Sequence, residues 1–278
     1  MIRLIRIILT SFVALTLCCG ICLTSPGSAA AAAASPYDIA AGSTLAAVIA
    51  RGKLVVGMEL KFWPFEYVTE KGDPVGFDVD IARQIAKELG VELDIKDMEW
   101  TGLIPALQAG KIDLIISGVT GTLERAKTIT FSRPYFTTGL CALTSTKKAP
   151  NLASVAALDD PNRIIAVKTG TTADLVAAKR FPKAHINRFK EETACVQEVV
   201  SGRADAFFYD QISIAKHHKQ NPEATKALLT PFTYEPFCIA MQKGDFDLWQ
   251  WLDMFLEISK SNGTLDDLRR KHFGELLQ

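Results

Sequence analysis

An α/β fold built of two lobes is predicted by three features of the sequence. Short apolar runs alternate with segments of helical period in two separate series, at residues 45–116 and 164–219. A polar connector at 146–151 separates the series, and two more helical segments follow the second one. Alternating strands and helices are typical of a mostly parallel sheet flanked by helices. The helices left over at the C-terminus indicate that one lobe interrupts the other, so that the chain crosses twice and forms a cleft.

The first series begins the first lobe. Apolar residues at positions 77, 81, 82, 85, 86 and 89 follow a helical period, and Gly90 closes this helix. The same criteria predict further helices at 45–50 and 103–109 and strands at 54–58, 91–95 and 112–116.

The second series builds the second lobe between two crossing strands, at 139–145 and 237–241. It contains predicted strands at 164–167, 184–189 and 204–209 and helices at 171–180, 191–201 and 211–219. Helices at 246–262 and 265–273 end the chain. The predicted division is a leader at 1–34, a discontinuous first lobe at 35–138 and 237–278, and a second lobe at 139–236.

The N-terminus has the order of segments that is typical of an export signal. Arg3 and Arg6 lie at the start of an apolar stretch at 4–23, and small residues extend to position 34. The apolar stretch is also long enough for an uncleaved membrane anchor, and the cysteines at 18, 19 and 22 make lipid attachment a further alternative. We expect a cleaved signal peptide at 1–34 and a soluble mature protein in the periplasm or outside the cell.

Composition excludes several classes of protein. The 278 residues are 48% hydrophobic, which is enough for a sizeable core, and 31 basic residues balance 31 acidic ones. This balance gives no general attraction to nucleic acid. Beyond the leader, Cys141, Cys195 and Cys238 are too far apart to indicate a metal site. They are interpreted as small buried side chains, with a Cys141–Cys238 bridge as the alternative. His217 and His218 are expected to be solvated.

Residues 117–125 combine features that suit a small carboxylate. Glycine in this segment allows backbone N–H groups to approach a ligand closely, and Thr122 is a good N-cap for a helix beginning here. The Arg125 guanidinium can hold a carboxylate through two parallel hydrogen bonds. From this segment alone, an ordinary turn between strand and helix with a solvated arginine is an equally good interpretation.

Several further segments, in the right order, resemble one family. Residues 75–82 resemble the Gly-Phe-Asp-Val-Asp-Leu-Ala signature of the family 3 extracellular solute-binding proteins, which are the polar amino-acid receptors of ABC importers. The other matching segments are residues 100–107, 110–113, 122–125, 131–136, 167–172, 202–206 and 262–264. The resemblance runs from about residue 51 to 274. It implies the two-lobed type II periplasmic-binding fold, with a hinge near 137–139 and 234–237.

The resemblance also implies which residues bind a ligand's amino-acid head group. Arg125 would hold the α-carboxylate with help from the Gly118 backbone, from Thr120, and from Thr171 or Thr172 of the second lobe. The α-ammonium would lie on Asp210, the Ser117 carbonyl and the Thr120 hydroxyl. A zwitterion has one group of each charge, so a desolvating cleft must supply both opposite charges. An N-cap role for Asp210 is compatible with this assignment.

The same resemblance places the ligand's side chain among Glu59, Phe62, Trp100, Lys168 and Tyr209. The aromatic rings could sandwich an aliphatic stem or a planar amide, or could simply pack in the core. Lys168 disfavours a cationic side chain and resembles the glutamine-binding members, whereas Glu59 could accept hydrogen bonds or pair with Lys168. We expect a polar neutral amino acid, glutamine first, with an acidic ligand as the next candidate.

The expected function is therefore binding rather than catalysis, with no metal, no cofactor and no catalytic residue. The protein would act as a monomer and deliver its amino acid to a membrane ABC permease, whose ATPase subunit is another chain. The alternative is an enzyme on the same fold, since cyclohexadienyl or arogenate dehydratases resemble these receptors. Glu59 would then be the candidate general acid or base, although no second catalytic partner is evident.

Overall fold

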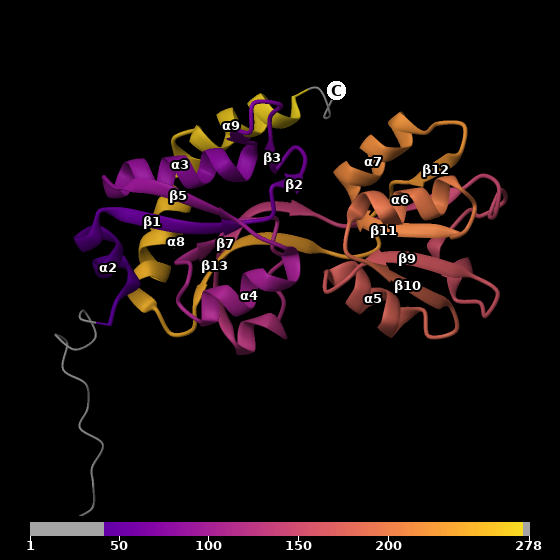
Figure 1. Ribbon diagram of the computed structural model, residues 1–278, viewed down its shortest axis with the longest axis horizontal. Coiled ribbons are helices and arrows are strands. Elements are labelled where there is room, and N and C mark those ends of the chain that lie inside the picture. The colour runs from indigo at the N-terminus through magenta and orange to yellow at the C-terminus, as the bar shows by residue number, and fades with distance from the viewer. Residues whose placement is uncertain (1–41, 275–278) are drawn as a thin grey trace, which may run out of the picture. The chain divides into compact units, whose positions relative to one another are not determined.

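A computed structural model of the chain describes residues 42–274, so the predicted leader at 1–34 lies outside the described residues. Figure 1 shows the α/β arrangement that the sequence predicts. Within residues 42–274 no helix is long and apolar enough to cross a membrane.

The first sheet has five strands in the order β5-β1-β6-β13-β7. Strand β1 (Lys53–Met58) runs parallel to β5 (Glu92–Asp97) and β6 (Leu114–Ile115). The later strand β13 (Glu235–Gln242) is antiparallel both to β6 and to β7 (Ile129–Thr138). Sequence analysis did not predict strand β7. The helices of this part are α2 (Thr44–Arg51), α3 (Phe77–Leu89), α4 (Trp100–Gln108), α8 (Phe246–Ser261) and α9 (Thr264–Phe273). A three-stranded sheet of β2 (Lys61–Phe62), β3 (Glu66–Val68) and β4 (Pro74–Val75) stands beside it.

The second sheet also has five strands, in the order β10-β9-β11-β8-β12. Its parallel strands are β9 (Ile164–Lys168), β10 (His185–Phe189) and β11 (Ala206–Asp210), and each is followed or preceded by a helix as the alternation predicts. Strands β8 (Leu140–Ser145) and β12 (Thr225–Leu228) are antiparallel additions. The helices are α5 (Thr172–Arg180), α6 (Glu192–Val200) and α7 (Gln211–Gln220), with a short 3-10 turn at Val155–Leu158.

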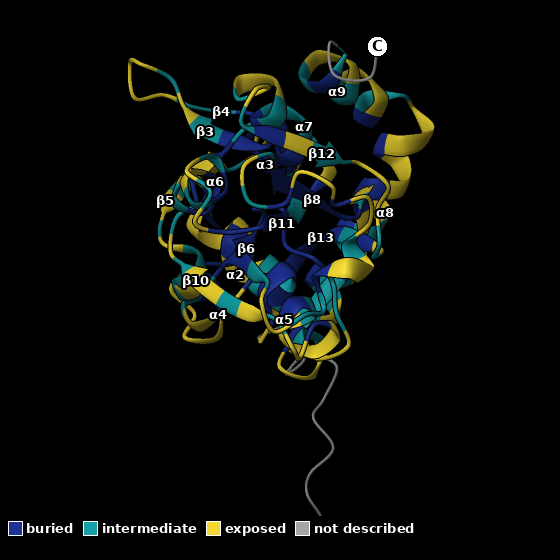
Figure 2. Cartoon of the chain, turned by 90° about the vertical axis from the view of Figure 1, so that its right-hand side faces the viewer, coloured by how far each residue is buried: buried dark blue, intermediate teal, exposed yellow. Residues whose placement is uncertain are grey.

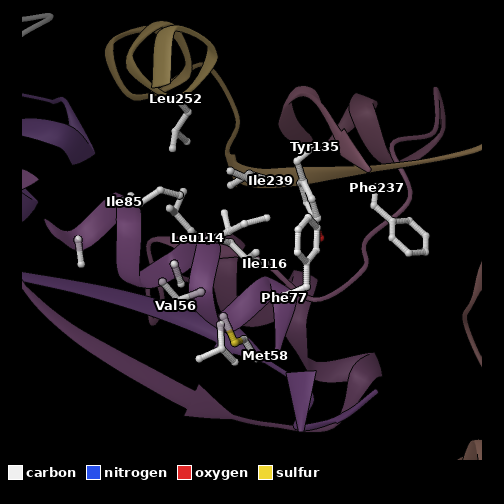
Figure 3. Close-up of a cluster of buried hydrophobic side chains, with 14 of the residues drawn as sticks. Val56, Met58, Phe77, Ile85, Leu114, Ile116, Tyr135, Phe237, Ile239 and Leu252 are labelled. Atoms are coloured by element: carbon white, nitrogen blue, oxygen red, sulfur yellow. The ribbon is translucent and has the colours of Figure 1, made fainter. Parts of the chain in front are cut away.

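Each sheet has its own apolar core. The strands β6, β8, β11 and β13 are buried along most of their length and dark blue in Figure 2, because side chains cover both of their faces. In the core of the first sheet, Phe77 and Tyr135 lie 6.1 Å apart between ring centroids and point toward one another in Figure 3. Phe65 stacks on Phe62 at 4.7 Å, so this aromatic cluster extends toward the segment that carries the candidate site.

The chain passes between the two sheets along two adjacent antiparallel segments. Thr138 at the end of β7 pairs with Glu235 at the start of β13. Beyond this pair the Leu140 N–H donates to the Thr233 hydroxyl at 2.9 Å. The backbone is so close at Gly139 that a Cβ atom there would lie 2.4 Å from the Thr233 carbonyl oxygen. The predicted lobe boundaries and hinge fall in this region and stay predictions.

We expect Gly139→Ala to destabilise the protein by about 1–3 kcal/mol, because the added methyl must push apart two backbone segments that have no room to separate. The control is Gly102→Ala in α4, where a Cβ meets nothing within 4 Å. Alanine there should be neutral or slightly stabilising, since it is the better helix former. Urea unfolding of both variants measures the difference, and equal stabilities would contradict the close approach at Gly139.

Candidate functional site

One cavity brings together the predicted ligand residues from both sheets, with the exception of Lys168. The space not filled by protein atoms is about 450 Å³, part of which is open to solvent. The predicted residues that line it are Glu59, Phe62, Trp100, Ser117, Gly118, Thr120, Arg125, Thr171, Thr172, Tyr209 and Asp210. Lys168 lies beside the cavity, where its ammonium bonds to Glu59.

Arg125 reaches the cavity from a short 3-10 turn, Arg125–Lys127, and not from the longer helix that the sequence suggested. One terminal nitrogen donates to the Thr120 carbonyl at 2.9 Å and the other to the Gly170 carbonyl at 3.2 Å. The guanidinium also lies 5.4 Å from the centroid of the Trp100 ring. Burial lowers the pKa of Arg125, yet the group stays charged. Because a guanidinium has five N–H donors, it retains donors for a carboxylate.

Asp210 has two roles at once. Its Oδ1 atom caps α7 by accepting from the backbone N–H groups of Ile212 at 2.9 Å and Ser213 at 3.1 Å. Its Oδ2 atom is buried and has no hydrogen-bond partner. Burial, and then the charge of Glu192, raise the pKa of Asp210 to about 6. The buried Oδ2 atom therefore has capacity to accept a hydrogen bond that the protein does not use.

A buried ion pair between Glu59 and Lys168 lies at one side of the cavity. Glu59 follows β1 of the first sheet and Lys168 ends β9 of the second, and the Lys168 ammonium donates to Glu59 Oε2. Both side chains are only about 4% exposed, so their charges must compensate one another. The second carboxylate oxygen, Glu59 Oε1, is buried without a partner. The sequence-based alternative that these two residues pair with each other is realised in this structure.

The Ser117–Gly118 segment contacts the protein differently from the sequence-based expectation. The Gly118 N–H donates to Asp78 Oδ2 at 2.7 Å, so it is not free for a ligand carboxylate. The Ser117 hydroxyl is bonded to Glu66 Oε1 at 2.6 Å and accepts from the Glu59 N–H at 3.0 Å. The side chains of Glu66 and Asp78 therefore hold this segment. Only the carbonyl groups of Ser117 and Gly118 remain as predicted backbone contacts to a ligand.

The two threonines at the start of α5 line the cavity, and Thr171 also bonds within the protein. The Thr171 hydroxyl donates to the Lys168 carbonyl at 2.7 Å and accepts from the Asp174 N–H at 3.4 Å, which makes Thr171 the N-cap of α5. Its hydroxyl proton is thus used within the protein. Thr172 and Ala173, in the first turn of α5, line the cavity. Free backbone N–H groups at a helix N-terminus favour an anion there, which suits a carboxylate held by Arg125.

Phe62 agrees with both interpretations made from the sequence, because it lines the cavity and also packs in the core. Phe62 contacts Tyr209 in an edge-on arrangement at 5.7 Å between centroids, and it also packs against the Phe65 ring of the core. Gly118 has a φ of +54°, and a Cβ on it would lie 2.5 Å from the Phe62 ring. Glycine is therefore required here both by the backbone conformation and by the ring that covers it.

Sequence analysis missed four residues that line the cavity: Glu66, Leu140, Ala173 and Phe237. Ala173 follows the predicted site residue Thr172, and Phe237 begins the predicted crossing strand at 237–241. These positions in the sequence could have indicated both residues. Glu66 had none, because its burial depends on residues far away in the sequence.

Two expectations about titratable side chains have different outcomes. His217 is only 4% exposed and contacts Glu192 Oε1 at 2.5 Å, so the prediction of a solvated side chain is wrong for this residue. Its helix α7 turns this face inward against α6, which a short polar sequence does not reveal.

Cys141, Cys195 and Cys238 are buried free thiols, as expected, and the alternative of a Cys141–Cys238 bridge is wrong. Within residues 42–274 no cluster of His, Cys, Asp and Glu side chains suits a metal ion.

Comparison with known proteins decides the family. The family model described as bacterial extracellular solute-binding proteins, family 3, matches residues 54–275, which is most of the chain. The chain belongs to this family. The family 3 match confirms the resemblance that sequence analysis found, together with the type II periplasmic-binding fold.

Relatives within the family bind different amino acids. The glutamine-binding protein of an ABC transporter from Bacillus subtilis is 34% identical over 239 residues, covering 84% of this chain and 85% of the relative. A crystal structure of an ancestral amino-acid-binding protein, described as a precursor of cyclohexadienyl dehydratase, is 40% identical with a TM-score of 0.77, covering 83% of this chain and 99% of the other. A transporter binding component from Wolinella succinogenes, in complex with lysine, is 38% identical with a TM-score of 0.75, covering 80% and 96%.

We expect Asp210→Asn to stabilise the ligand-free protein above pH 6. An aspartate whose pKa rises from 3.8 to about 6 on folding carries an unfavourable buried charge, and this cost grows as the pH rises through that interval. Asparagine caps a helix about as well and has no charge. The gain at pH 8 should be about 1–3 kcal/mol.

Unfolding free energies of this variant at pH 4 and pH 8 provide the measurement. The gain should be small at pH 4 and full at pH 8. The control is Asp73→Asn at an exposed position, where we expect a change within about 0.5 kcal/mol at both pH values. A loss of stability for Asp210→Asn at pH 8 would refute the account of a buried, poorly compensated charge.

Proposed function

We propose that this protein captures one free amino acid with a polar, uncharged side chain, glutamine first, and delivers it to a membrane ABC permease. One observation carries the proposal: Arg125 and Asp210, of opposite charge, line the same cavity, and each has hydrogen-bonding capacity that the protein does not use. A zwitterion supplies the matching carboxylate and ammonium. Burying both of its charges is favourable only where both partners are provided.

The Glu59–Lys168 side of the cavity supports a neutral ligand side chain. Arg125 and Lys168 carry two positive charges, and Glu59 and Asp210 carry two negative ones, so these four groups sum to zero. A zwitterion with a neutral side chain leaves this balance intact, whereas a charged side chain adds a buried charge without a partner. The unpartnered Glu59 Oε1 atom is an acceptor, and a side-chain amide provides the N–H donor that it lacks. The glutamine-binding relative agrees with this choice, and the lysine complex does not.

Binding would be coupled to closure of the two lobes around the ligand. Side-chain contacts join the first sheet's part of the chain to the second sheet's part. Among them are Arg125 to the Gly170 carbonyl, Glu59 to Lys168, and Lys61 to Glu191 at 3.0 Å. A ligand that contacts both sides adds to these interactions only when they are together, so it shifts the population toward closure. The permease would then recognise the closed form of an exported, monomeric protein.

Replacing the arginine tests the head-group assignment. In Arg125→Ala we expect the affinity for glutamine to fall roughly a hundredfold or more, since each hydrogen bond from a charged donor contributes about 1.5–3 kcal/mol. Lys127→Ala is the matched control, because it removes a positive charge from the same turn, at a side chain that is exposed and paired only with Glu124. Isothermal titration calorimetry compares the two, and near-normal binding by Arg125→Ala would exclude the assignment.

The pH dependence of binding tests Asp210 separately. The ligand ammonium pairs with the ionised carboxylate, whose pKa in the free protein is about 6. Protonation competes with binding below that value, so the affinity should fall up to tenfold for each further pH unit. Calorimetry at pH 7.5 and pH 5 should show roughly a tenfold loss in the unaltered protein. In Asp210→Asn, affinity should be low at both values, and a pH-independent affinity of the unaltered protein would argue against this pairing.

A dehydratase activity is the alternative, which the ancestral relative makes relevant. Glu59, the candidate general acid or base, is bonded to the Lys168 ammonium and is therefore not poised to donate a proton. We expect no product when the protein is incubated with prephenate or arogenate and followed by ultraviolet absorbance. Product formation at enzyme concentrations well below substrate would contradict a purely binding function.

A further inference from the structure

A buried group of acidic side chains lies against two adjacent cavity-lining residues, Ser117 and Gly118, which we call the cavity floor. Glu66 comes from β3, Asp78 from the first turn of α3 and Tyr135 from β7, and all three side chains are completely buried. None of them belongs to the ligand-binding set that the sequence predicted. Two carboxyl groups in such a place need an explanation, because burying even one ionised carboxylate is costly unless its oxygens are satisfied.

The hydrogen bonds of these acids hold the cavity floor in place. Glu66 Oε1 lies 2.6 Å from the Ser117 hydroxyl. Asp78 Oδ2 accepts both from the Gly118 N–H and from the Tyr135 hydroxyl, each at 2.7 Å. Glu66 therefore holds Ser117, and Asp78 holds Gly118. Ser117 and Gly118 are adjacent and both line the cavity, as Glu66 itself does.

The second oxygen of each carboxyl group lacks a hydrogen-bond donor. Glu66 Oε2 and Asp78 Oδ1 are both buried, and neither has a hydrogen-bond partner when both groups are ionised. The two acids hold adjacent residues, Ser117 and Gly118, and burial and a hydrogen bond between the two carboxyl groups are among the causes that raise the pKa of Glu66. Two carboxylates can only accept, so they cannot bond to each other. One proton between them turns two unpartnered acceptors into one donor and one acceptor.

We propose that Glu66 and Asp78 share one proton, with Glu66 as its carrier, and act together as positioning residues for the Ser117–Gly118 floor of the ligand cavity. The functional part of this inference rests on the proposed amino-acid binding. The shared proton itself does not. A neutral Glu66 also explains why this residue leaves the charge balance among Arg125, Lys168, Glu59 and Asp210 undisturbed.

The charged and titratable surroundings agree with a single remaining negative charge. Burial raises the pKa of Glu66 well above its ordinary value, and the nearby charges of Asp78 and Glu59 add to this effect. Burial raises the pKa of Asp78 to about 6, which the hydrogen bonds from Tyr135 and Gly118 limit. The other groups that face the pair are His272 of α9, which favours the ionised Asp78, and Tyr209 of β11, whose pKa burial raises above its ordinary value. These directions agree with Glu66 as the carrier of the shared proton and with Asp78 as its ionised partner.

The sign of the resulting pH dependence follows from the raised pKa. Between the ordinary pKa of a glutamate and the raised pKa of folded Glu66, the folded state binds one proton more than the unfolded state. Stability therefore falls as the pH rises through this interval, by up to tenfold in the folding equilibrium constant for each pH unit. Above about pH 7, Asp78 and Asp210 no longer contribute to this slope, because their pKa values are about 6.

Glu66→Gln is the direct test, since its amide donates where the protonated acid donates but does not titrate. We expect the ratio of folding equilibrium constants, variant to unaltered protein, to rise by up to tenfold per pH unit from pH 7 to pH 9. The control Glu70→Gln, at an exposed position on the same hairpin, should give a constant ratio. Parallel stability curves for Glu66→Gln and the unaltered protein would overturn the shared proton.

Infrared spectroscopy provides a readout that does not depend on stability. At pH 8 the unaltered, ligand-free protein should show the carbonyl band of a protonated carboxylic acid, and Glu66→Gln should lack it. Asp78→Asn guards against a Gln variant that fails to fold. Glu66 stays buried in that variant and remains the proton carrier, so the band should be retained there. A band retained in folded Glu66→Gln, lost in folded Asp78→Asn, or absent from the unaltered protein would overturn the proposal.

Ligand binding separates this inference from the proposed function. If glutamine binds, Glu66→Gln should bind it with nearly unaltered affinity at pH 7 and lose less affinity than the unaltered protein between pH 7 and pH 9. Glu66→Ala, which leaves Ser117 without its partner, should bind more weakly at both pH values. If no amino acid binds but the infrared and stability results hold, the proposed function fails while the shared proton stands. An equal loss of affinity in Glu66→Gln and Glu66→Ala at pH 7 would overturn the positioning role.

Discussion

The burial of charge around one cavity is the constraint on which the rest of this structure depends. Arg125, Asp210 and Glu59 line this space and Lys168 lies beside it, and of these four only Glu59 and Lys168 are bonded to each other. Arg125 is held by two carbonyl groups, and Asp210 by the N-terminus of α7. These neutral dipoles fix the positions of the two charges without cancelling them. In the proposed function, a molecule that carries both charges completes the site.

The contacts of the cavity floor follow from the same constraint. Position 118 requires glycine because its φ is positive and the Phe62 ring covers it, and the Gly118 N–H bonds to Asp78 because it is buried away from water. Asp78 and Glu66 in turn need the proton that we place between them. Gly118, Asp78 and Glu66 are thus each satisfied by the next one, and the rings of Phe65 and Phe77 pack in the apolar core of the same sheet.

The sequence predicted those parts of the fold that periodicity and local glycine stops determine. The strand at 112–116 and the helix at 77–89 correspond to β6 and α3, since each has a strong apolar pattern of its own. Thr122 predicted a helix, but only a 3-10 turn forms there because β7 begins at Ile129. Glu66 and His217 could not be predicted as buried. Their partners, Ser117 and Glu192, are 51 and 25 residues away, and only the folded chain brings them together.

The central claim is that one zwitterion completes the charges of Arg125 and Asp210, and a crystal structure with glutamine bound tests it most directly. The account predicts the α-carboxylate on the Arg125 guanidinium and the first turn of α5. It places the α-ammonium on Asp210 Oδ2 and the side-chain amide within hydrogen-bonding distance of Glu59 Oε1. A ligand bound with its head group reversed, or outside this cavity, would contradict the account.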